Sequence, residues 1–117
     1  MDATILIITG IIIGIAASFF GLGGGFLMVP LLIFLGYSAQ KSVGSSFLAI
    51  LMISASAVVA HGKLANIDYK TALMLGVGGI VGAQIGAHLL EQVTTVNFKK
   101  IFAAALFIIA GYLFFKK

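Results

Sequence analysis

The residues best suited to chemistry are backbone amides exposed by a run of glycines from Gly21 to Gly25. Four of these five residues are glycine, and each costs about 1 kcal/mol relative to alanine inside a helix, so an unbroken helix is not expected. A helix that starts after the break leaves its first N–H groups unpaired and carries partial positive charge there. Glycine also lets a ligand approach the backbone. The pattern predicts an anion site at Gly23, Gly24, Gly25 and Phe26.

Two serines further along, Ser45 and Ser46, could add hydroxyl donors to this site. The alternative is that each hydroxyl bonds to the backbone of its own helix, as serine often does in membrane helices. The sequence leaves both possibilities open. The single amide within an apolar segment, Gln84, is expected to make a helix–helix contact. His61 and His88 lie near segment ends, which favours the membrane surface over a metal or proton role.

Groups needed for other chemistry are scarce in this sequence. No Asp or Glu falls inside an apolar segment, and the chain has no cysteine. An enzyme needs a general acid, a base or a metal, so we expect no enzyme, no metal site and no cofactor. A cation exporter would need a carboxylate within the membrane, so the electrostatics favour a neutral or anionic ligand.

Composition indicates that lipid is the solvent of these segments. Hydrophobic residues make up 62% of the 117 residues and charged residues 9%, against about 25% charged in a typical soluble domain. A soluble fold of this length could not bury so much apolar surface. The net charge of +4 comes from lysines placed singly at segment ends, which indicates membrane anchoring and not nucleic-acid binding.

The gaps between charges predict the helices that must position these residues. The charge-free run 3–40 would form a helix of about 55 Å, longer than the hydrocarbon core of about 30 Å, so it must break at the glycines. The halves could form a hairpin that enters and leaves on one side, or one broken crossing. We expect a single transmembrane domain, 1–117, with helices at 4–20, 26–37, 43–60, 71–90 and 101–115.

Small residues recur every four positions in two of the expected helices. Gly78, Gly82 and Gly86 form one such series, and Gly10, Gly14 and Ser18 form another. This spacing places a flat stripe on one helix face, where another helix backbone can approach closely. We expect the first series to be a packing seam. Whether the seam lies within the chain or between chains is left open.

The segment 21–32, GLGGGFLMVPLL, resembles the signature of the TauE/SafE family of sulfite and organosulfonate exporters. Four further stretches resemble family elements in the same order. They are Val43–Leu48 with Ser45 where threonine is usual, Gly62 with Asn66–Asp68, Gly78–Ala87 and Phe98–Phe102. The resemblance covers nearly the whole chain. It implies an all-α integral membrane fold in which a glycine-broken hairpin and three transmembrane helices form one repeat of a two-repeat transporter.

The resemblance also implies a function and a partner. The expected activity is transport of a small sulfur-containing or organic anion, such as sulfite or a sulfonate, across a prokaryotic cytoplasmic membrane. Family members usually hold two repeats, so we expect a homodimer. In the hairpin arrangement three lysines face one side and four the other, and this weak bias permits an antiparallel dimer. The alternatives are a small anion-selective channel and a non-transporting assembly subunit.

Overall fold

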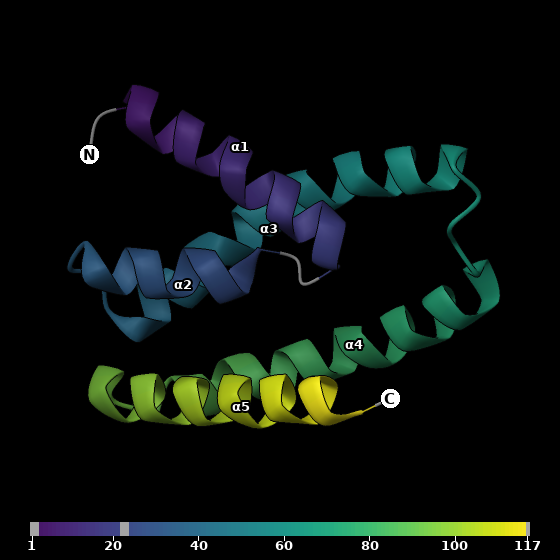
Figure 1. Ribbon diagram of the computed structural model, residues 1–117. Helices are drawn as coiled ribbons and strands as arrows, with labels where there is room; N and C mark the ends of the chain where they lie inside the picture. Colours follow the sequence, from purple (N-terminus) through teal and green to yellow (C-terminus); the bar gives the residue numbers. More distant parts are fainter. Residues whose placement is uncertain (1–2, 22–23, 117) are drawn as a thin grey trace.

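A computed structural model describes residues 3–21 and 24–116, and within them the chain forms helices and no strand. The helices are α1 (Ala3–Phe20), α2 (Gly25–Phe34), α3 (Ala39–Lys63), α4 (Tyr69–Leu90) and α5 (Thr95–Phe115). Successive helices run in alternating directions (Figure 1). The all-α membrane fold expected from the sequence is therefore confirmed, while several helix boundaries differ from those expected.

Side-chain caps determine where α3, α4 and α5 begin. In each case the cap accepts a hydrogen bond from the backbone N–H three residues later: Ser38 from Lys41, Asp68 from Thr71 and Thr94 from Asn97. Such caps satisfy an N–H that has no partner within the helix. As a result α3 begins at Ala39 and not at 43, and α5 begins at Thr95 and not at 101. The segment 95–100, expected to lie between two helices, is thus helical.

Helices α2 and α3 each end at a residue in the left-handed conformation, and α2 ends earlier than expected. Gly36, with φ of 102°, lets Tyr37 N–H reach the carbonyl of Leu32 at 3.1 Å, so α2 stops at Phe34 and not at 37. At the end of α3 the same geometry is built around Ala65, with φ of 58°. Both ends match the Schellman arrangement, for which glycine is the usual residue.

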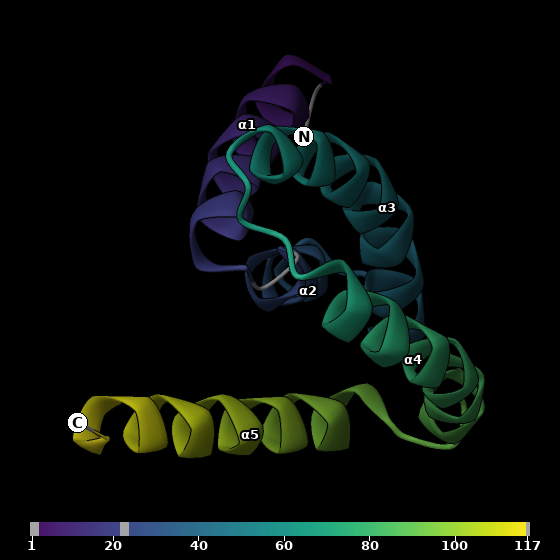
Figure 2. The same cartoon turned by 90° about the vertical axis from the view of Figure 1, so that its right-hand side faces the viewer.

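The N-terminal pair of helices forms a hairpin and not a broken crossing. The imidazole of His61, in the last turn of α3, lies 3.2 Å from the carbonyl oxygen of Ser18, near the end of α1. These two helices therefore finish at the same end of the molecule. Between them α2 runs back in the opposite direction (Figures 1 and 2). With α3, α4 and α5 crossing in turn, the described ends of the chain lie on opposite sides.

A small core forms where α1, α2 and α3 meet. Most of the contact is between α2 and α3, and α1 lies across α3. The buried side chains are Ile13, Ala17, Met28, Val29, Ala39, Ser42 and Ser46. This core positions the start of α2. Because it holds so few residues, most apolar side chains remain on the outside.

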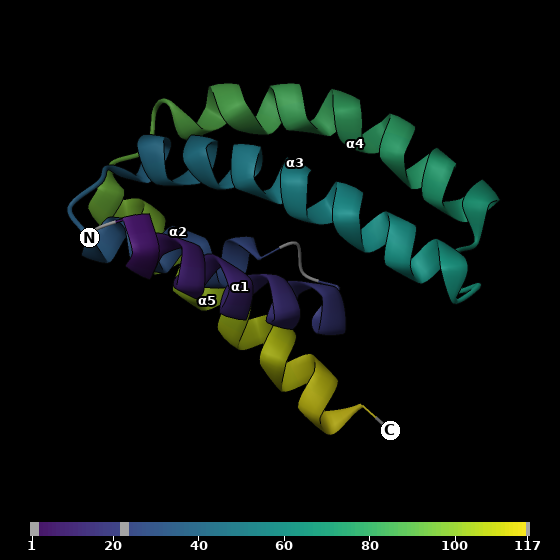
Figure 3. The ribbon, with the colours of Figure 1, turned by 90° about the horizontal axis from the view of Figure 1, so that it is seen from above.

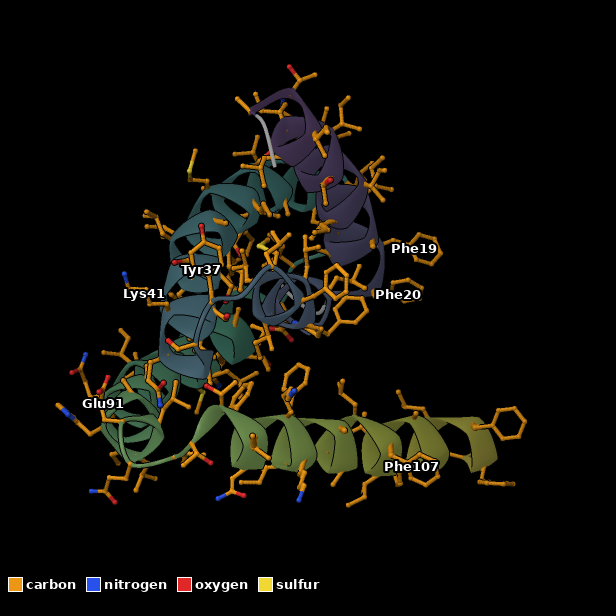
Figure 4. All side chains as sticks on the ribbon, turned by 90° about the vertical axis from the view of Figure 1, so that its left-hand side faces the viewer. Phe19, Phe20, Tyr37, Lys41, Glu91 and Phe107 are labelled. Carbon is orange, nitrogen blue, oxygen red and sulfur yellow. The ribbon has the colours of Figure 1, made fainter. Side chains whose placement is uncertain are left out.

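By contrast, α4 and α5 bury no residue. Figures 2 and 3 show α5 leaving the packed helices, and Figure 4 shows Phe19, Phe20 and Phe107 pointing away from neighbouring helices. Within the described residues, α1, α3, α4 and α5 are long and apolar enough to span a membrane. An apolar exterior on spanning helices is the surface expected of a multi-pass membrane protein.

Candidate functional site at the glycine break

The chain breaks where the sequence predicts, and glycine geometry makes the break. Helix α1 ends at Phe20 and α2 begins at Gly25. Gly21 and Gly24 have φ of 74° and 85°, in the left-handed region that glycine adopts without a steric penalty. Of the expected site residues, Gly23 lies outside the described part of the chain.

The first amides of α2 are available to a ligand. The N–H groups of Leu27 and Met28 bond to the carbonyl of Gly24 at 3.1 and 2.9 Å. The N–H groups of Gly25 and Phe26 make no hydrogen bond to another residue in the ranges 3–21 and 24–116. The cap residue Gly24 offers no side-chain acceptor. Unpaired amides at a helix start carry partial positive charge, so this end of α2 can bind an anion.

The start of α2 lies beside the middle of α3. A Cβ atom placed on Gly25 would be 3.5 Å from Cδ1 of Ile50, which is near the midpoint of Ala39–Lys63. A helix of this length reaches about 37 Å and exceeds the hydrocarbon core, so its midpoint lies near the bilayer centre. The amides at Gly25 and Phe26 thus lie about half-way along a helix long enough to span a membrane.

Close packing holds the glycine turn in place. Gly24 is buried, and a Cβ atom there would lie 3.1 Å from both Ile13 Cγ2 and Met28 Cε. Ala17 is also in contact, at 3.6 Å. These contacts are tighter than ordinary packing, so a side chain at Gly24 would require Ile13 and Met28 to shift by a few tenths of an ångström. Gly24 is therefore held in place by side chains of α1 and α2.

The two serines expected to help the glycine site lie in different surroundings. Ser46 is 2% exposed, and its hydroxyl donates to the carbonyl of Val43 at 2.8 Å. This bond is the local alternative considered from the sequence. Ser45 lines a mostly apolar cavity of about 540 Å³ shared by α1, α2 and α3, which includes Thr9 and Met28. Their part in binding stays a prediction.

A second polar group, absent from the expected site, lines a cavity of about 340 Å³ between the ends of α1 and α3. His61 Nε2 lies 3.2 Å from the Ser18 carbonyl and 3.3 Å from its hydroxyl, and Asn66 Nδ2 lies 3.0 Å from His61 Nδ1. Gly21 lines the same cavity, so the cavity reaches the glycine turn. Ser18 and His61 are 43 positions apart, and no sequence pattern linked them.

Other candidates named from the sequence lie away from both cavities. Gln84 and His88 are exposed on α4. In the parts of the chain that the structure describes, no three His, Cys, Asp or Glu side chains gather as a metal site would require. The described polar groups that could meet a solute therefore include the α2 amides, Ser45 and the cluster around His61.

These features define a multi-pass α-helical membrane protein with a glycine break between α1 and α2. The sequence matches the sulfite exporter TauE/SafE family over residues 6–117, and the chain belongs to this family. The resemblance inferred from the glycine motif is thus confirmed.

Individual relatives agree with the family assignment. Probable membrane transporter protein YunE of Bacillus subtilis is 32% identical over 99% of this chain and 45% of its own length. A probable membrane transporter of Methanocaldococcus jannaschii is 32% identical over 97% and 44%. Sulfite exporter TauE/SafE family protein 3 of Arabidopsis thaliana is 31% identical over 90% and 22%. The chain spans under half the length of these relatives. No solved structure matches significantly.

Proposed function

We propose that this chain forms half of a membrane transporter for a small sulfur-containing or organic anion, such as sulfite or a sulfonate, in the cytoplasmic membrane. The observation that carries the proposal is the start of α2. Two N–H groups without described partners, those of Gly25 and Phe26, lie beside the midpoint of α3. Such a helix start carries partial positive charge, so it attracts an anion and disfavours a cation.

The surroundings of this helix start favour the same substrate class. Asp68 and Glu91, the acidic residues in the described chain, lie between helices and not within a span. A cation at mid-depth would meet no carboxylate, whereas an anion would meet the α2 amides. The names of the relatives, probable membrane transporters and a sulfite exporter family protein, support transport and suggest a sulfur oxyanion as the substrate.

The proposed working form is a homodimer in which a second copy supplies the second repeat. Support comes from α4, which buries no residue, and where Cβ atoms at Gly78, Gly82 and Gly86 would meet nothing within 4 Å. A glycine stripe offers close backbone approach to another helix. The two ends of the described chain lie on opposite sides, so an inverted pair is the arrangement we favour (Figure 1).

Flux through liposomes that contain only this chain tests the transport proposal. Sulfite, methanesulfonate and acetate are compared, with empty liposomes as the control. Saturable counterflow of sulfite or methanesulfonate is the expected result. Large single-channel currents without counterflow would show that the protein is an anion channel and not a transporter. Absence of flux for every anion would leave only a packing subunit.

Accessibility of the two chain ends tests the inverted dimer. The chain has no cysteine, so Thr4→Cys and Lys116→Cys each provide a single label site. In intact cells a membrane-impermeant maleimide should label part of each population, because copies insert in both directions. If each position reacts from one side only, the copies share one orientation and the inverted arrangement is wrong.

A further inference from the structure

The cavity between the ends of α1 and α3 carries no carboxylate and no lysine. Its polar lining consists of Ser18, Ser54, His61 and Asn66, and Gly21 connects it to the glycine turn. The Ser54 hydroxyl makes no hydrogen bond to any residue in the described ranges. The cavity therefore offers a hydroxyl without a described partner and an imidazole between α1 and α3.

The hydrogen-bond partners of His61 match a neutral ring with its hydrogen on Nε2. The Ser18 carbonyl can only accept, so Nε2, at 3.2 Å, carries the hydrogen. The Asn66 amide nitrogen can only donate, so Nδ1, at 3.0 Å, accepts. In this state the wall of the cavity is uncharged. The carbonyl ends of α1 and α3, which carry partial negative charge, then disfavour an anion.

A proton on Nδ1 would reverse this situation. The Asn66 amide would turn to present its oxygen, and the ring would donate from both nitrogens. Imidazole is the side chain whose charge ordinarily changes between pH 5 and 8. The resulting cation would have no carboxylate in the cavity to neutralise it.

Charged and titratable groups on the surrounding elements do not replace that missing partner. Helix α1 has no ionisable side chain. Lys63 follows His61 on α3, and Lys70 lies in the first turn of α4. Asp68 already accepts the N–H of Thr71 at 3.1 Å. The Tyr69 hydroxyl lies beside Gly62, 3.5 Å from a Cβ placed there.

We propose that His61 binds a proton together with the anion, so that this cavity takes up a small oxyanion only as its imidazole becomes charged. The oxyanion pairs with the imidazolium and accepts hydrogen bonds from the Ser18 and Ser54 hydroxyls. The proton comes from water at the end of the molecule where α1 and α3 finish, resides on Nδ1 while the anion is bound, and is released with the anion once the site opens to the opposite side. One proton thus accompanies one monovalent anion, and the step is electroneutral. This inference rests on the proposed transport function.

Methanesulfonate is a suitable probe because it stays ionised, so any proton that moves with it must be carried by the protein. In liposomes holding the full chain, one unit of inward pH gradient should drive about tenfold accumulation, because tenfold is the limit for one coupled proton. A trapped pH dye should report internal acidification. Calorimetry of binding in two buffers of different ionisation enthalpy should show one proton taken up per anion.

His61→Gln removes the titration and keeps a donor for the Ser18 carbonyl, and His88→Gln is the matched control on exposed α4. His61→Gln should lower accumulation below twofold and abolish proton uptake on binding, while His88→Gln should match the wild type. Tenfold accumulation by His61→Gln overturns the inference. So does wild-type binding without proton uptake, a measurement that needs no variant to fold. Wild-type counterflow without gradient-driven accumulation refutes this inference alone, whereas absence of all flux refutes the proposed function itself.

Discussion

Gln40, in the first turn of α3, binds the turn between α4 and α5: its Nε2 donates to the carbonyl oxygen of Val93 at 2.7 Å. The same nitrogen donates to the Leu90 carbonyl at 2.9 Å. Beside it, the backbone N–H of Ala39 donates to the Thr95 hydroxyl at 3.0 Å. Because α4 and α5 bury no residue, these bonds are a main tie between them and the packed helices.

Gln40→Ala should therefore loosen this end of the molecule. The Leu90 and Val93 carbonyls would lose their donor, at a cost of about 1–3 kcal/mol if they stay away from water. Thermal unfolding in detergent measures the effect. Gln92→Ala, at an exposed site in the same turn, is the control and should change stability little. Equal loss from both variants would contradict the assigned role.

Gly24 offers a second prediction, which tests the glycine turn. Gly24→Ala should destabilise by about 1–2 kcal/mol from its left-handed backbone alone, and crowding of Ile13 and Met28 at 3.1 Å adds to this. The same change should weaken methanesulfonate binding, because the first turn of α2 must shift. Thermal unfolding with and without the anion separates the two effects.

The matched control for Gly24 is Gly10→Ala, within α1, where a Cβ atom meets nothing within 4 Å. That variant should be neutral or stabilised by up to about 1 kcal/mol, since alanine is the better helix former. Anion binding unchanged in Gly24→Ala, despite the loss of stability, would place the anion away from the start of α2.

Local signals in the sequence were sufficient to predict that the helices form and that the chain breaks at the glycines. Gly21 and Gly24 do adopt conformations that favour glycine, and the charge-free runs do become helices. Boundaries shifted where short-range capping outweighed hydropathy, as at Ser38 and Thr94. The segments 39–42 and 95–100 contain lysine and lie outside the helices expected from hydropathy, although a capped helix can begin at such a segment.

Long-range pairing could not be predicted in the same way. Contact between Ser18 and His61 depends on where α1 and α3 both end, which follows from the hairpin turn and not from residue type. His61 alone suggested a surface position. For the Ser46 hydroxyl the sequence permits either a ligand or a backbone carbonyl as partner, and in the structure it donates to the carbonyl of Val43. Serine near an available carbonyl makes both outcomes physically reasonable, so only the structure distinguishes them.

Ala65 is a site where glycine should improve stability. Its φ of 58° is the left-handed conformation, which costs an L-residue about 1–2 kcal/mol. Ala65→Gly removes that cost, and greater freedom of the unfolded chain offsets part of it, leaving a gain of about 0.5–1 kcal/mol. The control Ala104→Gly, inside α5, should lose about 1 kcal/mol. Thermal unfolding should thus show that alanine-to-glycine substitution raises stability at Ala65 and lowers it at Ala104. A loss of stability at both sites would refute the prediction.

The glycine stripe of α4 gives the last prediction, on assembly. Leucine at Gly82 projects into open space in the single chain, so Gly82→Leu should fold as the wild type does. If α4 forms the dimer seam, the added side chain prevents close backbone approach and the dimer should dissociate. Gly76→Leu is the control, because it is equally open but lies about 120° around the helix from Gly82. Sedimentation in detergent measures both variants. Dimers that persist in Gly82→Leu would show that the second repeat packs on a different face of this chain.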